Sequence, residues 1–168
     1  MSMTHYMELL ASNQPWNLII FMAIPVILAE TIAITELYLL FTRNMQSRAK
    51  QISKWAGIFV GIYFLGIFLY LFTTAVIPLT TTGAWRGFAD VIAVGFYLAG
   101  IVPLFSISLL ELGIIKKGST DEEKLKLHAV FVAIFLVVAH VAMIFGMVNP
   151  DIFTKNNIHT EMPAQMHM

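Results

Sequence analysis

Four long apolar stretches, separated by short polar segments, dominate the chain. They cover residues 16–42, 55–78, 88–115 and 125–148. Each exceeds the ~20 residues that a helix needs to cross a hydrocarbon core of ~30 Å. They are also too long and too continuously apolar for barrel strands, which have ~10 residues of alternating character. Because only helices and closed barrels satisfy every backbone polar group in lipid, the pattern predicts an all-α integral membrane protein with four transmembrane helices.

The connections between these stretches are short, at residues 43–54, 79–87 and 116–124. Short connections favour antiparallel neighbours, so we expect an up-down-up-down bundle that forms a single domain over residues 1–168. In the third connection, Ser119 or Thr120 is expected to cap the fourth helix. The ends of the chain, residues 1–15 and 149–168, are expected to be flexible tails.

The basic residues are distributed unevenly among the loops. Eight of the ten lie in or directly beside the first and third connections, at Arg43, Arg48, Lys50, Lys54, Lys116, Lys117, Lys124 and Lys126. The positive-inside rule therefore predicts that these connections are cytoplasmic. Both termini are then periplasmic or extracellular, and we expect a multi-pass protein of a bacterial inner membrane.

Composition excludes several classes of protein. Hydrophobic residues make up 58% of the chain and charged residues 12%, with a mean hydropathy of +0.79. A soluble domain averages about 45–50% apolar and about 25% charged residues, so a soluble enzyme is not expected. The formal net charge of zero argues against nucleic-acid binding. No cysteine is present, and no nucleophile triad, phosphate loop or dinucleotide fingerprint is recognisable, so no catalytic residues are predicted.

Five ionisable residues interrupt the apolar stretches and are the candidates for function, because charge inside a membrane is costly. At 1.5 Å per residue, Glu36, Glu111 and His128 lie ~9, ~6 and ~4.5 Å from the inner ends of their spans. Glu30 and His140 lie deeper, at ~18 and ~22 Å. We therefore expect an inner layer and a midplane layer, each a hydrogen-bonded or metal-bridged cluster. Asp90, near the outer end of the third span, is expected at the membrane interface.

Three interpretations of these layers remain open. Carboxylate and imidazole groups hydrogen-bond helices together, they bind transition metals such as zinc, iron, manganese or copper, and they relay protons. Haem b is an alternative cofactor through His140 and His128. These histidines lie ~18 Å apart on one helix and cannot ligate one haem within one chain, so a haem needs a partner chain or Met22.

Both tails are rich in methionine and histidine, which are soft to borderline ligands that favour copper. The candidate ligands are Met3, His5 and Met7 in the N-terminal tail, and His159, Met162, Met166, His167 and Met168 in the C-terminal tail. The leading hypothesis is a membrane protein that handles a transition metal, with copper favoured. A redox subunit that binds haem b or quinone, and an accessory subunit of a larger complex, are the alternatives.

The apolar stretches also contain residues that bend helices or bring them together. Pro25 and Pro103 remove backbone hydrogen bonds and are expected to kink their spans. Gly57 and Gly61 match the small-xxx-small pattern of closely packed helix pairs. The expected partners are therefore the lipid bilayer and a second copy or a larger membrane complex.

Overall fold

The computed structural model describes residues 3–115, 118 and 120–149, and within these residues it is all helical, without strands. Four helices are long and apolar enough to cross a membrane: Trp16–Thr42, Arg48–Thr82, Phe88–Glu111 and Asp121–Met147. This confirms the prediction of an all-helical chain with four helices that are long and apolar enough to span a membrane.

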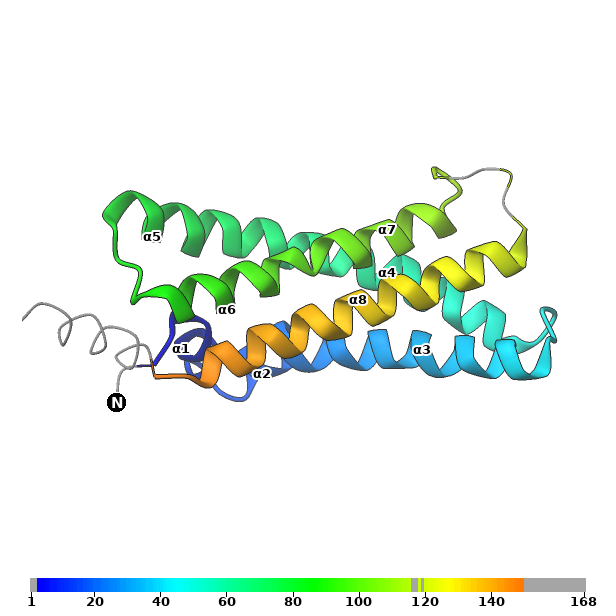
Figure 1. Ribbon diagram of the computed structural model, residues 1–168, viewed down its shortest axis with the longest axis horizontal. Helices are drawn as coiled ribbons and strands as arrows, with labels where there is room; N and C mark the ends of the chain where they lie inside the picture. Colours follow the sequence, from blue (N-terminus) through cyan, green and yellow to red (C-terminus); the bar gives the residue numbers. More distant parts are fainter. Residues whose placement is uncertain (1–2, 116–117, 119, 150–168) are drawn as a thin grey trace, which may run out of the picture.

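Most of these spans are built from several consecutive helical segments (Figure 1). The described chain contains one helix before the spans, α1 (His5–Ala11). The spans consist of α2 (Trp16–Leu18), η1 (Ile19–Ala23), α3 (Ile24–Thr42), α4 (Arg48–Leu71), η2 (Phe72–Val76), α5 (Ile77–Thr82), α6 (Phe88–Ala99), α7 (Ile101–Glu111) and α8 (Asp121–Met147). The η segments are π-helices, which are wider than α-helices and are frequent where a helix bends.

Two helices begin earlier than their apolar stretches. Thr120 accepts a hydrogen bond from the Glu123 backbone N–H, and the Glu123 side chain accepts one from the Thr120 N–H, so a capping box starts α8 at Asp121. Ser47 occupies the N-cap position of α4 without a side-chain capping hydrogen bond, and the helix includes Arg48, Lys50 and Lys54 of the first connection. Hydropathy marks only the lipid-facing part of a helix, whereas capping and polar helix formers set its ends.

The π-helical segment just before Pro25 accepts hydrogen bonds from tyrosines of two other spans. Proline has no N–H, so the carbonyl of Phe21 loses the hydrogen bond that it would accept in a regular α-helix. The Tyr97 hydroxyl donates to this carbonyl, and the Tyr63 hydroxyl donates to the carbonyl of Ile20 at 3.0 Å. In the third span, the α-helix is interrupted at Gly100, between α6 and α7, which is three residues before Pro103.

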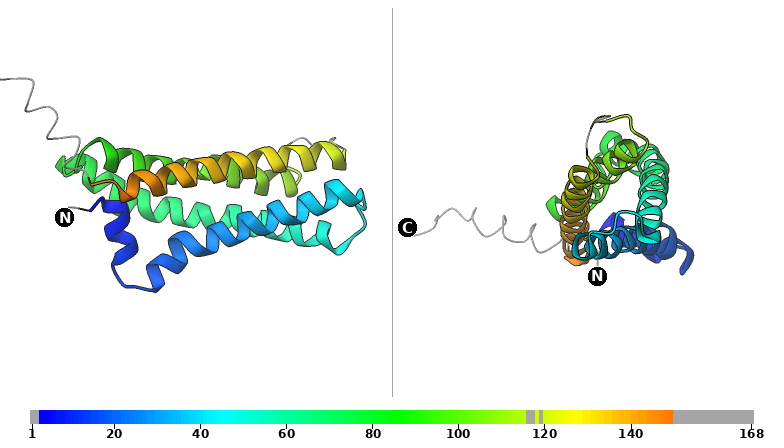
Figure 2. Two further views of the ribbon diagram at one scale, coloured as in Figure 1. Left: turned by 60° about the horizontal axis from the view of Figure 1, so that its bottom comes forward. Right: turned by 90° about the vertical axis from the view of Figure 1, so that its right-hand side faces the viewer.

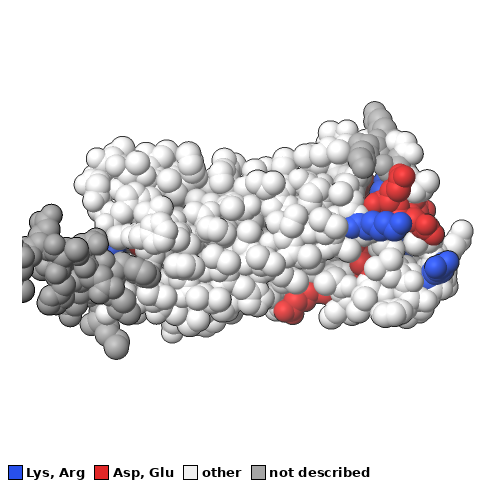
Figure 3. Space-filling view, viewed as in Figure 1, with Lys and Arg blue, Asp and Glu red and all other residues white. Residues whose placement is uncertain are grey.

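The long helices surround a common core, as the end-on view in Figure 2 shows. α3 packs against α4 and α8, α4 also packs against α7, and α8 contacts both α6 and α7. The core includes Ile32, Phe64, Leu104 and Val132, one from each span. Charged side chains gather at one end of the visible face, and most of its middle is uncharged (Figure 3). We call this end, which carries residues 43–47 and the start of α8, the basic end.

The opposite end is covered by α1, and we call it the α1 end. Helix α1 packs against α6 and α8, and it buries Tyr6 and Leu10, which share one face at a spacing of four residues. Burial raises the pKa of Tyr6 to about 12, so its phenol is neutral over the physiological range. The expectation that residues 1–15 are a flexible tail is therefore wrong for this helix. The expected C-terminal tail lies outside the described residues, apart from Asn149.

Candidate functional site

A buried carboxylate–imidazole pair joins α3 to α8 near the basic end. Nδ1 of His128 lies 2.6 Å from Oε1 of Glu36. The Ser53 hydroxyl of α4 donates a second hydrogen bond to the same oxygen at 3.1 Å. Glu36 is 1% exposed and His128 is 2% exposed, so the pair is shielded from its surroundings.

Glu111, the last residue of α7, completes this group. Its Oε1 lies 3.4 Å from Nε2 of His128, which is within ion-pair distance without forming a hydrogen bond. We call Glu36, Ser53, Glu111 and His128 the inner cluster. Each of the four spans contributes one member, and the structure brings the predicted inner layer of Glu36, Glu111 and His128 together. Ser53 was not singled out from the sequence, because a lone serine in the basic first connection carries no distinguishing signal.

The two ring nitrogens of His128 have different roles in this geometry. Nδ1 shares a hydrogen bond with Oε1 of Glu36, whereas Nε2 faces Oε1 of Glu111 without a hydrogen bond. Among the described residues, Nε2 of His128 and Oε2 of Glu36 are buried without a hydrogen-bond partner. Buried polar atoms are nearly always paired, so the cluster has unused capacity for a proton or another cation.

We also asked whether these residues could bind a metal ion. Within the described part of the chain, no group of three or more His, Cys, Asp or Glu residues could hold a metal ion. The inner cluster offers nitrogen and oxygen atoms only, which suit borderline and hard metals better than Cu(I).

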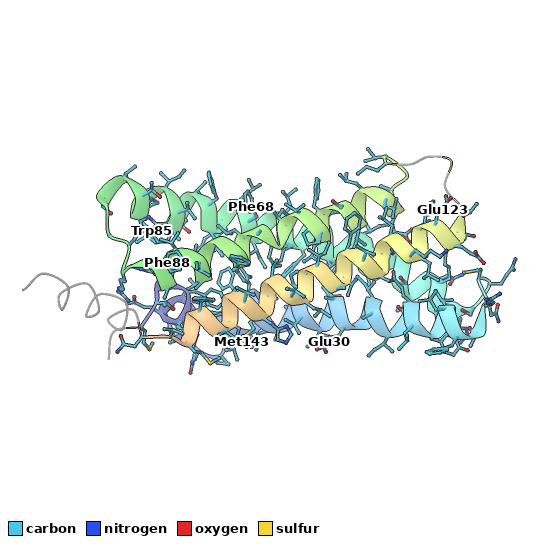
Figure 4. The ribbon with its side chains drawn as sticks, in the orientation of Figure 1. Glu30, Phe68, Trp85, Phe88, Glu123 and Met143 are labelled. Atoms are coloured by element: carbon cyan, nitrogen blue, oxygen red, sulfur yellow. The ribbon has the colours of Figure 1, made fainter. Side chains whose placement is uncertain are left out.

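The predicted midplane layer does not form. Glu30 and His140 are both exposed, and Figure 4 places Glu30 at the outer edge of α3. His140 uses Nδ1 to bond the backbone carbonyl of Leu136, one turn earlier in its own helix, at 2.6 Å. The expectation of a Glu30–His140 cluster inside the bundle is wrong, because the two helices are rotated so that these positions lie outside the core.

The predicted N-terminal soft ligands lie in different surroundings. Met3 is 42% exposed, Met7 is half-buried beside Gly146, and His5 is paired with Asp90. The C-terminal candidates His159, Met162, Met166, His167 and Met168 lie outside the described residues.

Comparison with known proteins places the chain in a family. A family model described as "Family of unknown function (DUF6803)" matches residues 1–162. The chain belongs to this family. No curated protein and no solved structure matches it. The family match includes α1 and all four spans, so the inner cluster and the α1 end both fall inside the family region.

A second polar network fastens α1 to the bundle in this family member. Asp90 in the first turn of α6 is fully buried, and its carboxylate accepts hydrogen bonds from the His5 backbone N–H at 2.7 Å and the Arg86 backbone N–H at 3.2 Å. Nδ1 of His5 lies 2.6 Å from Oδ2 of Asp90, the oxygen that also accepts from the Arg86 N–H, and Arg86 pairs with Glu8 at 2.6 Å. The expectation that Asp90 is interfacial missed this burial, because α1 was taken for a tail.

We expect Asp90→Ala to release α1 while the four spans stay folded. Loss of charge-assisted hydrogen bonds of about 1.5–3 kcal/mol each should accelerate amide hydrogen exchange in α1 at least tenfold. Asp121→Ala is the control, because Asp121 is also in the first turn of a helix but pairs with Lys50 at an exposed site. Unchanged protection of α1 in Asp90→Ala would show that apolar contacts alone hold the helix.

Proposed function

We propose that this protein is an integral membrane protein that takes up and releases a proton at the inner cluster, as part of a proton-coupled transport process. The observation that carries the proposal is a buried imidazole between two carboxylates on other helices, at 2.6 and 3.4 Å. Ionisable groups inside a membrane are rare and typically serve proton or ion pathways.

The charge balance of the cluster supports proton exchange. With both carboxylates ionised, a protonated His128 leaves one net negative charge, and one further proton makes the cluster neutral. Since His128 links α8 to α3 and α7, each protonation step changes the forces between these helices. Such a local change in charge is a physical means of shifting helix packing, as transport requires.

The proposed orientation places the inner cluster near the cytoplasm. We propose an up-down-up-down topology in a bacterial inner membrane, with the basic end cytoplasmic and both termini outside, according to the positive-inside rule. Glu111 is then the point of proton entry, because its side chain is 10% exposed whereas that of Glu36 is 2% exposed.

A transition-metal ion bound by only two ligands of this cluster, His128 and Glu111, is the second candidate, since the described residues supply no set of three. The specific observation is that Nε2 of His128 is unpaired and lies 3.4 Å from Oε1 of Glu111. Two ligands at about 2.1 Å from a tetrahedral zinc ion are separated by about this distance. Zinc, manganese and iron suit these atoms better than Cu(I) does, and capture of Cu(I) is a separate hypothesis for the C-terminal tail.

The haem and scaffold alternatives have less support. Both ring nitrogens of His128 face carboxylates, so a haem would have to use His140 together with a ligand from a partner chain. The scaffold alternative leaves the unpaired buried atoms of the inner cluster without a role.

Infrared difference spectroscopy of the purified protein between acidic and alkaline pH tests the proposal. We expect a carboxyl signal that titrates in the wild type and is altered in Glu111→Gln and His128→Gln. Glu30→Gln is the matched control, because it removes a span carboxyl outside the cluster. Identical titration in all variants would overturn the proposal. Stoichiometric metal that copurifies and is lost only in the cluster variants would establish the second candidate instead.

A further inference from the structure

Glu30 and His140 are left without a role by the inner cluster, although both lie within membrane-spanning helices. Both side chains are exposed, and no described residue forms a hydrogen bond or ion pair with the Glu30 carboxylate. Nε2 of His140 is likewise without a described partner. Ionisable residues in transmembrane segments almost always pair or face a polar cavity, so this exposure is unusual for a single chain in lipid.

The two residues border the same groove. A shallow hollow of about 160 Å³ runs between α3 and α8, and its lining includes Ala33 and Leu37 of α3 and Ala133 and Leu136 of α8. Glu30 lies three residues before Ala33, and His140 lies four residues after Leu136. Because such spacings place side chains on one helix face, Glu30 and His140 flank the continuation of the groove toward the α1 end.

Helix geometry directs the two side chains toward a common depth. Counted from the Glu36–His128 contact, Glu30 is ~9 Å and His140 ~18 Å closer to the α1 end. Helical side chains lean toward the N-terminus of their own helix. α3 and α8 run in opposite directions, so Glu30 leans toward the α1 end and His140 toward the basic end (Figure 1). Their polar atoms therefore converge on one level.

We infer that a second copy of this chain binds at the α3–α8 face, with Glu30 of each copy paired with His140 of the other. An acid and a base on one face are self-complementary under a two-fold axis, so the face needs no different partner to satisfy both groups. Ala129 and Ala133 border the groove and form a small-xxx-small pattern on α8, which permits close approach of helices. Pairing across the axis removes both ionisable groups from lipid.

Cysteine cross-linking in native membranes tests this interface, because the chain contains no cysteine of its own. We expect disulfide-linked dimers from Leu37→Cys and from Ala133→Cys. Phe59→Cys is the matched control: Phe59 is 56% exposed on α4, and the Glu36–Ser53 contact places it at about the depth of Glu30. Equal cross-linking at Phe59, or none at either groove position, would overturn the inference. Cross-links to a different protein from the groove positions would overturn it as well.

Exchange of the two side chains tests the pairing itself. In liposomes at increasing dilution, Glu30→His and His140→Glu should each weaken self-association about tenfold, as loss of polar contacts between membrane helices does. The double variant should restore association. If either residue had only a structural role, the double variant would instead associate more weakly than either single variant.

Absorption spectra of the same samples provide a further check. A haem band that is lost in His140→Glu would identify His140 as a haem ligand and overturn the pairing.

Glu36 of the inner cluster also lines the groove, so separate variants are needed to distinguish this inference from the proposed proton exchange. Loss of dimers in Glu30→His with normal titration of the inner cluster would support both conclusions. Conversely, loss of titration in Glu111→Gln with normal dimer formation would also show that proton exchange and dimerisation depend on different residues.

Discussion

Replacement of His128 by alanine is expected to lower the free energy of unfolding by about 3–5 kcal/mol, because removing one partner of a buried ion pair leaves an uncompensated charge. His128 is the link between α3, α7 and α8 in the inner cluster. Without it, Glu36 keeps only the hydrogen bond from Ser53.

Chemical unfolding in detergent, followed by the helix signal in circular dichroism, measures this loss. His140→Ala is the matched control, because it removes the same type of side chain from an exposed position of the same helix. At dilutions where the protein is monomeric, this control should stay close to the wild type. Addition of Glu36→Gln to His128→Ala should recover part of the lost stability, since the double variant no longer buries a free carboxylate at position 36. Equal stability of the two alanine variants would contradict a coupled cluster.

Gly61→Ala is expected to separate α4 from α7 and to destabilise the protein by about 1–3 kcal/mol or more, as overpacking of a close contact does. A Cβ atom at Gly61 would lie 2.3 Å from Cβ of Ser108 and 2.7 Å from the backbone carbonyl oxygen of Leu104. Neither atom belongs to the flexible end of a side chain, so the helices themselves must move. The small-xxx-small pattern of Gly57 and Gly61 thus serves packing within the chain.

Gly66→Ala on the same helix is the control. A Cβ atom there has nothing within 4 Å, and alanine is a better helix former than glycine by about 0.8–1.0 kcal/mol. We therefore expect this variant to unfold at an unchanged or slightly higher denaturant concentration. If Gly61→Ala behaved like Gly66→Ala, the close approach of α4 and α7 would be incorrect.

The sequence alone determined the four spans and the depth of each polar residue within them. Depth follows from counting residues along a helix, because the rise of 1.5 Å per residue does not depend on the neighbours. For this reason Glu36, Glu111 and His128 could be assigned to one layer before any packing was known. Thr120 was also recognisable as a cap, because capping depends on local chemistry.

Only the tertiary structure decided which face of each helix points inward. In a soluble protein the polar face marks the outside, but these spans are apolar on the lipid side as well as the core side. Periodicity therefore could not show that Glu30 and His140 lie outside the core. The docking of α1 was equally hidden, since His5 and Asp90 are 85 positions apart in sequence. Such contacts depend on how distant segments pack in three dimensions.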